Sequence, residues 1–268
     1  MAESSDNQAL YRLQEDSLRR LQAMGDSQFD QAKLCGGTAL SRCWLGHRVS
    51  YDIDFFLPEG FNAVRLALAI KNAGIDFESR DLVDDPRKAN QLHGYMVLKE
   101  GRLKVSFVED AYFQIFPAVK RPFGDLVAST EEIPGLYHRK LRTVAGGGSE
   151  GDAFDGGRQK ARDLFDLYVL SVAFMPIKPF MASLPYSFPA AAFENGLANM
   201  PWFELMDELN EMTCDPKWMA AKDVAFLQDA LFDQIGAKAL DDFAHDADLT
   251  TARAQGRPGG HGRGGLKR

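Results

Sequence analysis

The segment that decides the fold is LCGGTALSRCWLGHRVSYDIDFF, residues 34–56. It joins two adjacent glycines, Gly36 and Gly37, to an apolar stretch that is interrupted only by Asp52 and Asp54. Hydrophobic spacing and turn residues predict strand, turn, helix, loop and strand in that order. We expect the first strand at 29–34, the helix at 38–45, the loop at 46–50 and the second strand at 51–57.

The two aspartates are expected to share one face of the second strand. Residues i and i+2 of a strand point the same way, about 7 Å apart at their Cα atoms. Two carboxylates this close in an apolar strand repel each other and lose hydration, which is costly unless a cation neutralises them. Asp52 and Asp54 therefore suit Mg²⁺ or Mn²⁺, ions held by carboxylates together with substrate phosphates. The alternative is an exposed pair of aspartates at a strand end.

The glycines stand where a strand turns into a helix. Free backbone N–H groups and the helix dipole can hold a phosphate at such a point. Gly36 and Gly37 would let the backbone approach closely, and Thr38 offers a hydroxyl group. Alone, the two glycines could equally form only a tight turn. Followed by Asp52 and Asp54 on a strand, they predict a phosphate site beside a metal site.

The flanking sequence predicts an α+β fold. Leucines at helical spacing form an opening helix that ends at Gly25, and Asn62 suits the N-cap of a helix that runs to Ala73. The expected later elements are strands at 77–83, 95–98 and 103–108, helices at 133–144 and 158–174, and a flexible loop at 146–157. We divide the chain into a mixed α/β lobe at 1–128, a helical lobe at 129–249 and a disordered basic, Gly-rich tail at 250–268.

Composition narrows the class of protein. The 268 residues are 45% hydrophobic, enough for a large core, and carry a net charge of −7. This acidic balance argues against coating nucleic acid by bulk charge, although basic clusters at 139–142 and 158–162 suit either a local RNA groove or a solvated helix face. Without a long apolar run or a signal-like start, we expect a cytoplasmic protein with no membrane partner. The three cysteines lack zinc-like spacing and fit reduced thiols.

Three segments resemble one known family. GGTALSRCWLGHRVSYDIDFF is similar to the signature of the AbiEii/AbiGii toxin-type nucleotidyltransferases, in the DNA polymerase β-like nucleotidyltransferase superfamily. There a Gly-Gly or Gly-Ser precedes Asp-x-Asp by roughly ten to thirteen residues, and here thirteen lie between Thr38 and Asp52. HRKLRTVAG around Lys140 and RQKARDLFDLY around Asp163 and Asp166 resemble the family's later motifs. The resemblance covers 34–170 and implies a polymerase β-like lobe followed by a helical lobe that completes the active-site cleft.

The resemblance assigns roles to particular residues. It implies that Asp52 and Asp54 bind Mg²⁺ or Mn²⁺, that Lys140 holds the triphosphate of an NTP, and that Asp163 completes the site. Such residues stabilise the charge of nucleotidyl transfer electrostatically. The expected nucleotide-binding residues are Gly36, Gly37, Thr38, Arg48, Ser50 and Lys140.

Other polar residues near these motifs have open roles. Arg48 suits a phosphate, or an ion pair with Asp52 or Asp54. His47 is a better loop-orienting group than a base. Asp166 and Arg162 belong either to the site or to an ion-paired helix that docks the two lobes.

One position departs from the superfamily pattern. Many polymerase β-like enzymes carry a third carboxylate on a neighbouring strand, where LKVSFVED holds Ser106. Glu109 and Asp110 are substitutes that lie near the strand end. The function we expect is transfer of a nucleotidyl group from an NTP, most plausibly to a tRNA 3′ end, by a toxin with a cognate protein antitoxin. The alternatives are transfer to a protein hydroxyl, or an NTP-binding regulatory module without efficient transfer.

Overall fold

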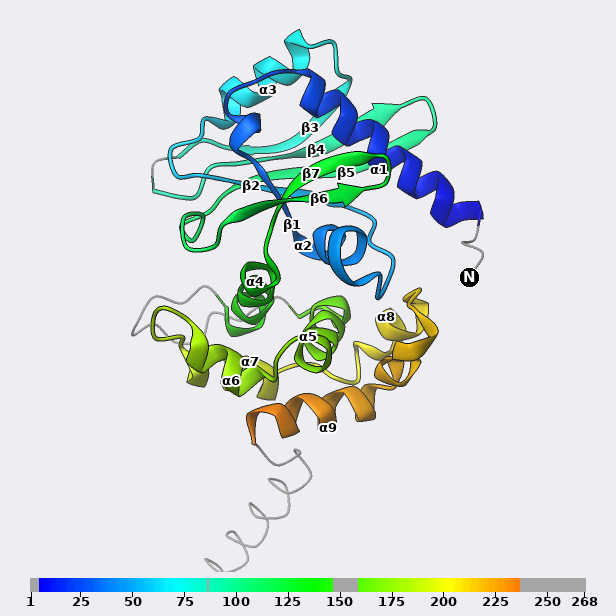
Figure 1. Cartoon of the computed structure of the whole chain (residues 1–268), viewed down its shortest axis with the longest axis vertical. Helices are drawn as coiled ribbons and strands as arrows, with labels where there is room; N and C mark the ends of the chain where they lie inside the picture. Colours follow the sequence, from blue (N-terminus) through cyan, green and yellow to red (C-terminus); the bar gives the residue numbers. More distant parts are fainter. Residues whose placement is uncertain (1–4, 86, 147–158, 237–268) are drawn as a thin grey trace, which may run out of the picture.

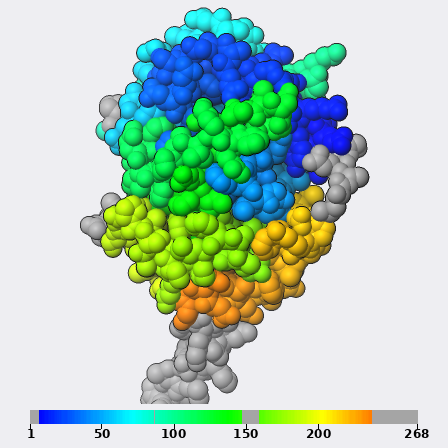
Figure 2. All heavy atoms as spheres, in the orientation of Figure 1, coloured from blue at the N-terminus to red at the C-terminus, as the bar shows by residue number. Residues whose placement is uncertain are grey.

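The computed structural model describes residues 5–85, 87–146 and 159–236, which form a sheet lobe stacked on a helical lobe (Figure 1). The space-filling view shows the two lobes in close contact along their shared boundary (Figure 2). The expected tail at 250–268 and the loop at 147–157 lie outside the described residues. The architecture is α+β, as the sequence predicts.

The sheet lobe is built on a mixed seven-stranded sheet in the order β3-β4-β5-β2-β1-β7-β6. β2 runs parallel to β5, and β1 runs parallel to β7, while the other neighbours are antiparallel. The strands are β1 (Lys33–Cys35), β2 (Ile53–Leu57), β3 (Phe77–Val83), β4 (Gln91–Leu98), β5 (Gly101–Glu109), β6 (Ala118–Phe123) and β7 (Leu126–Glu131).

The helices divide between the two lobes (Figure 1). In the sheet lobe they are α1 (Ser5–Ala23), the 3₁₀ turn η1 (Phe29–Gln31), α2 (Gly36–Thr38), which continues as the π-helix η2 (Ala39–Leu45), and α3 (Ala63–Asn72). In the helical lobe they are α4 (Ile133–Ala145), α5 (Ala161–Ala173), α6 (Ile177–Ser183), α7 (Ala190–Ala198), α8 (Met206–Glu211), the 3₁₀ segment η3 (Pro216–Lys222) and α9 (Val224–Ile235).

The two faces of the sheet differ in chemistry. Along β2, Ile53, Phe55 and Leu57 are buried in the core that α1 and α3 cover, and Phe55 stacks on Phe107 of β5. Because successive strand residues alternate between faces, Asp54 lies on the opposite face, which is turned toward α4 of the helical lobe.

Backbone hydrogen bonds join the lobes at the loop before β2. The Val49 N–H donates to the Thr213 carbonyl, and the Asp215 N–H donates to the His47 carbonyl, both at 2.9 Å. Arg48 and Cys214 thereby form an isolated antiparallel bridge. The segment that leads into the aspartate strand is thus fixed by residues more than 160 positions later in the chain.

Most expected elements are confirmed, including the N-cap at Asn62, whose side chain accepts the Arg65 N–H. The expected strand at 29–34 is wrong in its first half, because the Asp26 carboxylate accepts the N–H groups of Gln28 and Phe29 and holds a 3₁₀ turn there.

The β6–β7 hairpin was not expected from the sequence. Pro122 obscures its signal, since proline donates no ladder hydrogen bond and is tolerated at an edge such as β6. The expected lobe boundary after residue 128 falls inside β7. We propose that the helical lobe begins after Glu131.

No single helix among the described residues is long and apolar enough to cross a membrane, and α5 and α6 meet that test only as a pair bent by 82°.

Candidate active site

The glycine turn at the end of β1 lies directly against polar side chains of the site. Gly36 has φ +70°, and a Cβ atom there would lie 2.6 Å from Oδ2 of Asp54. A Cβ at Gly37 would collide with the guanidinium of Arg48 and lie 2.9 Å from the Ser50 hydroxyl. No side chain therefore fits at either position, because the neighbouring side chains lie too close to the backbone. At Gly36 the positive φ also favours glycine.

The helix after the turn is held against the aspartate strand. The Thr38 hydroxyl donates a short hydrogen bond to the Asp52 carbonyl, which fixes the start of β2 relative to α2. The helix then widens into the π-helix η2 and ends at Gly46, which has φ +60°. Such widened turns are rare and often occur at functional sites.

Asp52 and Asp54 differ in exposure and in their neighbours. The Asp52 side chain is 22% exposed, and its Oδ2 lies 3.7 Å from both Lys104 Nζ and Arg162 Nη1. Burial first, and then the charge of Asp52, raise the pKa of Asp54. Ser106 of β5 donates a hydrogen bond to Asp54, which acts in the opposite direction. A buried carboxylate with a raised pKa beside a second carboxylate forms a site that gains from a bound cation.

Asp54 opens into a pocket of about 250 Å³ between the sheet and α4. Gly36 lines it on one side, and Lys140 lines it from the helical lobe. Arg139 also lines it, with its guanidinium 4.2 Å from the centroid of the Phe56 ring. The pocket therefore brings the glycine turn, one aspartate of the pair and the motif lysine to one place. The remaining lining residues are His93, Lys104, Ser106, Val108, Leu136 and Thr143.

A buried charge cluster lies behind the pocket. Lys140 Nζ is 2.6 Å from Asp163 Oδ1 and 2.7 Å from Asp166 Oδ2, and both carboxylates are fully buried on α5. Arg48 binds Asp166 through two hydrogen bonds, from Nε to Oδ1 at 2.6 Å and from Nη2 to Oδ2 at 2.7 Å. The cluster joins the loop before β2 to α4 and α5.

The charges in this cluster determine the protonation states of its members. Burial alone would raise the pKa of Asp166, but Arg48 and Lys140 outweigh it and hold that pKa well below its usual value. His47 lies 2.7 Å from Asp166 through Nε2, and burial lowers its pKa despite that contact. His47 is therefore a neutral, fully buried group that orients the carboxylate, as expected for a loop-orienting residue.

The structure assembles the residues that the sequence singled out, with one change of partner. Arg48 binds Asp166 under the glycine turn, and the cations found beside Asp52 are Lys104 and Arg162. The residues expected to replace the third carboxylate are used elsewhere. Glu109 accepts the N–H groups of Gly60 and Asn90, and Asp110 pairs with Arg139. Arg158 lies outside the described residues.

Two titratable pocket residues were missed from the sequence, His93 and Lys104, whereas Arg139 was expected only as part of the basic cluster at 139–142. A usable signal for His93 was the hairpin turn between β4 and β5. The pairing of Leu98 with Gly101 at the turn places His93 opposite Ser106. The ion pairs of Arg139 with Asp110 and Glu131, which lie 29 and 8 positions away in sequence, had no such signal.

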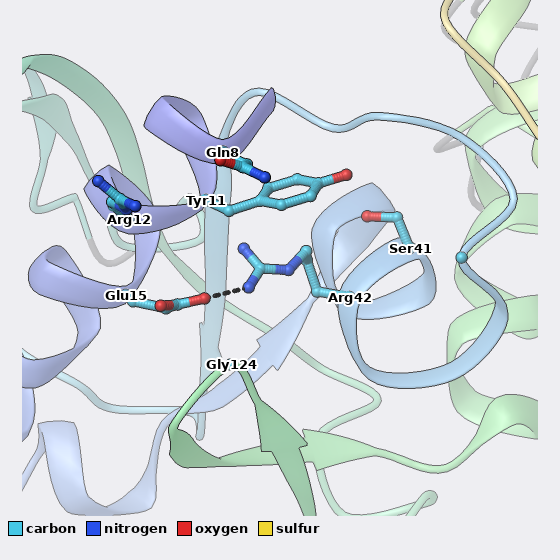
Figure 3. Close-up of a pocket in the computed structure, with 8 residues that line it drawn as sticks. Gln8, Tyr11, Arg12, Glu15, Ser41, Arg42 and Gly124 are labelled. Carbon is cyan, nitrogen blue, oxygen red and sulfur yellow. Dashed lines mark hydrogen bonds and ion pairs between the residues drawn. The ribbon is translucent and has the colours of Figure 1, made fainter. Parts of the chain in front are cut away.

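A larger pocket of about 570 Å³ lies beyond η2, between α1 and the β6–β7 turn (Figure 3). Its central Arg42 stacks on Tyr11 and Phe123 and forms a short ion pair with Glu15. Its guanidinium is thus already engaged by protein groups. None of the twelve sequence-selected site residues lines this pocket.

The residues present fit a divalent cation bound together with a nucleotide. Within the described part of the chain, no group of three or more His, Cys, Asp and Glu side chains could hold a metal ion. Mg²⁺ needs only one or two carboxylates when substrate phosphates supply further oxygens. Asp52 and Asp54, with the glycine turn packed so closely against Asp54 that no Cβ would fit, offer that donor set.

Comparison with known proteins gives a family match. A sequence model described as "Nucleotidyl transferase AbiEii toxin, Type IV TA system" matches residues 19–254. No match was found among curated proteins.

Solved structures with an overall likeness have low sequence identity. JHP933 from Helicobacter pylori is 16% identical with a TM-score of 0.49, covering 93% of this chain and 100% of that one. The nucleotidyltransferase toxin MenT4 from Mycobacterium tuberculosis H37Rv is 16% identical with a TM-score of 0.49, and the match covers 95% of this chain and 94% of that one. An antigenic nucleotidyltransferase-like protein from Paracoccidioides brasiliensis is 15% identical with a TM-score of 0.44, and the match covers 82% of this chain and 94% of that one.

Proposed function

The chain belongs to the AbiEii family of nucleotidyltransferase toxins, and from that membership we propose that it moves a nucleotidyl group from an NTP to a tRNA 3′ end in a Mg²⁺-dependent reaction. The single observation that carries this proposal is the approach of the glycine turn to Asp54. A phosphate-binding turn and a metal-binding carboxylate are useful together only if a phosphate and a cation meet between them.

The proposed roles follow from where each residue lies. Gly36 lines the pocket, and the backbone N–H groups of the glycine turn would hold the triphosphate there. Asp52 and Asp54 would hold Mg²⁺ or Mn²⁺, which supplies positive charge to the phosphate oxygens when bound. Lys140 keeps its ammonium fixed beside Asp54, because Asp163 and Asp166 hold it from behind. A cation fixed in advance costs little reorganisation during reaction.

The mouth of the site supports a polyanionic acceptor. Lys104 and Arg162 are 45% and 39% exposed and flank Asp52. They can contact phosphates of an RNA acceptor whose terminal hydroxyl enters the pocket. Arg139, expected to contact RNA, is instead engaged by Asp110 and Glu131. A cognate antitoxin protein and a cytoplasmic setting, where NTPs and tRNA occur, complete the proposal.

The test is nucleotide transfer with each labelled NTP, Mg²⁺ and total tRNA. We expect label on tRNA with wild-type protein and a loss of at least about 10²-fold in Asp52→Asn, because one carboxylate of the cation site is removed. Asp125→Asn is the matched control, since Asp125 is 69% exposed and neither it nor its ion-pair partner Arg19 lines the pocket. Label on protein instead of RNA would support a protein hydroxyl as acceptor.

The second candidate function is an NTP-binding regulatory module without efficient transfer. Ser106 favours it, because a hydroxyl stands where many related enzymes carry a third carboxylate. Nucleotide binding that persists in wild type, without label on any RNA or protein, would establish this alternative and reject transfer.

A further inference from the structure

One row of side chains crosses four strands on the active-site face of the sheet. Asp54 of β2 is in register with Ser106 of β5, Ser106 with His93 of β4, and His93 with Asp81 of β3. Directly paired residues share a face, so the row reads Asp54, Ser106, His93 and Asp81. Asp54, Ser106 and His93 also line the same 250 Å³ pocket.

The order of the strands determines where an attacking hydroxyl enters. The glycine turn follows β1, Asp54 lies on the neighbouring β2, and β5 and β4 come next. In phosphoryl and nucleotidyl transfer, the attacking and leaving oxygens are roughly in line across the phosphorus. A pyrophosphate leaving toward the glycine turn therefore requires an attacking hydroxyl on the other side of Asp54, above Ser106 and His93.

Ser106 cannot take the proton from that hydroxyl. Its own hydroxyl is a donor to Asp54, and a serine hydroxyl is not basic. Its short side chain also leaves room above β5. Neighbouring strands are about 4.8 Å apart, so Asp54 and His93 are roughly 10 Å apart at Cα. A hydroxyl between them is within reach of the half-buried imidazole.

The hydrogen bond of His93 leaves one ring nitrogen available as an acceptor. Nε2 lies 2.8 Å from Oε1 of Gln91, and an amide oxygen only accepts. In the neutral imidazole, Nε2 therefore carries the proton and Nδ1 carries the lone pair. Nδ1 has no partner among the described residues.

The charged groups around His93 are mixed in sign. The charged and titratable groups that face it are Asp81 on β3, Tyr95 on β4, Lys104 on β5, Asp52 and Asp54 at β2, and Arg139 and Lys140 on α4.

We propose that His93 is the general base of this enzyme, and this role rests on the proposed function. Nδ1 takes the proton of the acceptor hydroxyl as its oxygen forms a bond to the α-phosphorus. The bond from that phosphorus to the bridging oxygen breaks, and pyrophosphate leaves with the electron pair. The imidazolium returns its proton to water before the next cycle. His93 thereby supplies the proton acceptor that the missing carboxylate would have provided.

The experiment uses the full chain, Mg²⁺ and whichever NTP and acceptor the wild-type protein labels. His93→Gln should lower kcat about 10²- to 10⁴-fold, the usual contribution of a general base, while NTP affinity changes less than about threefold. In wild type, kcat/KM should fall toward acid pH, and this fall should be smaller in His93→Gln. In His93→Ala, added imidazoles should restore rate, and more basic imidazoles should restore it better.

Tyr95→Phe is the matched control, because Tyr95 follows His93 on the same face of β4 but does not line the pocket. It should keep wild-type rates. If His93→Gln transfers nucleotide within threefold of wild type, or loses NTP binding in parallel with rate, the base assignment is wrong although the transferase function stands. If wild type labels nothing while Asp52→Asn and wild type bind NTP alike, the proposed function itself fails.

Discussion

Arg48 and Asp166 form a bidentate ion pair that joins the two lobes beneath the glycine turn. Its two hydrogen bonds measure 2.6 and 2.7 Å, and the Asp166 side chain is completely buried. Lys140 and His47 contact the same carboxylate. Asp166 is thus the common partner of the groups that position the pocket's lysine and the loop before β2.

Asp166→Asn should therefore destabilise the protein strongly. The neutral amide leaves Arg48 and Lys140 with less compensating charge, and removing one partner of a buried pair costs about 3–5 kcal/mol. Thermal or urea unfolding measures the change. Asp125→Asn, which removes an exposed pair with Arg19, should stay within about 1 kcal/mol of wild type. Equal destabilisation of both variants would contradict the cluster's structural role.

The glycine turn can be tested with two glycines of matched backbone conformation. Gly36 and Gly74 have φ +70° and +71°, but a Cβ meets Asp54 at Gly36 and open space at Gly74. Alanine at either position should cost about 1 kcal/mol from backbone strain. Only Gly36→Ala should also displace the Asp54 carboxylate and weaken NTP binding in Mg²⁺ by about tenfold or more. Calorimetric titration of NTP in Mg²⁺ distinguishes the two variants. Equal NTP affinities would show that the close approach of Gly36 to Asp54 does not matter for binding.

Stability should depend on pH through His138. Burial first, and then Arg139 and Arg142, lower the pKa of this histidine to about 4. The unfolded chain, with a histidine pKa near 6.5, binds a proton that the folded chain does not bind between these values. Stability is therefore full above about pH 6.5 and falls by roughly 3 kcal/mol as the pH drops toward 4.

His138→Phe should remove that slope. The side chain is surrounded by Tyr112, Phe116 and Phe188, which a phenylalanine ring can contact as well. Urea unfolding between pH 7 and pH 4 gives the measurement. A variant that loses stability with acid as steeply as wild type would show that other groups are responsible.

Lys104 and Arg162 should contribute to RNA binding through charge. Removing one cation that binds a phosphate lowers the salt dependence of binding by about one unit of slope. Lys104→Ala and Arg162→Ala should each weaken tRNA binding and flatten a plot of log affinity against log salt. Lys71→Ala is the control, because Lys71 is exposed on α3 at the opposite face of the sheet. A slope that is unchanged in both site variants would place the acceptor elsewhere.

The sequence predicted the parts of the site that depend on local pattern. The glycine turn follows from two adjacent glycines between a strand and a helix, and the position of Asp54 opposite the buried Ile53 and Phe55 follows from strand periodicity. Asp52, expected on the same strand, lies just before β2. The partner of Arg48 could not be predicted from local pattern. Asp166 lies 118 positions away, and several other acidic residues could have paired with Arg48 by charge. The β6–β7 hairpin was missed for a local reason, because Pro122 argues against a strand unless the edge position of that strand is known.

The backbone pairing of residues 47–49 with 213–215 has a consequence for synthesis of the protein. A nascent chain that already contains every acidic residue of the site still lacks the segment that fixes the loop before β2. We expect a fragment ending near residue 200 to bind no NTP, and a toxin made on the ribosome to stay inert until its last quarter has emerged.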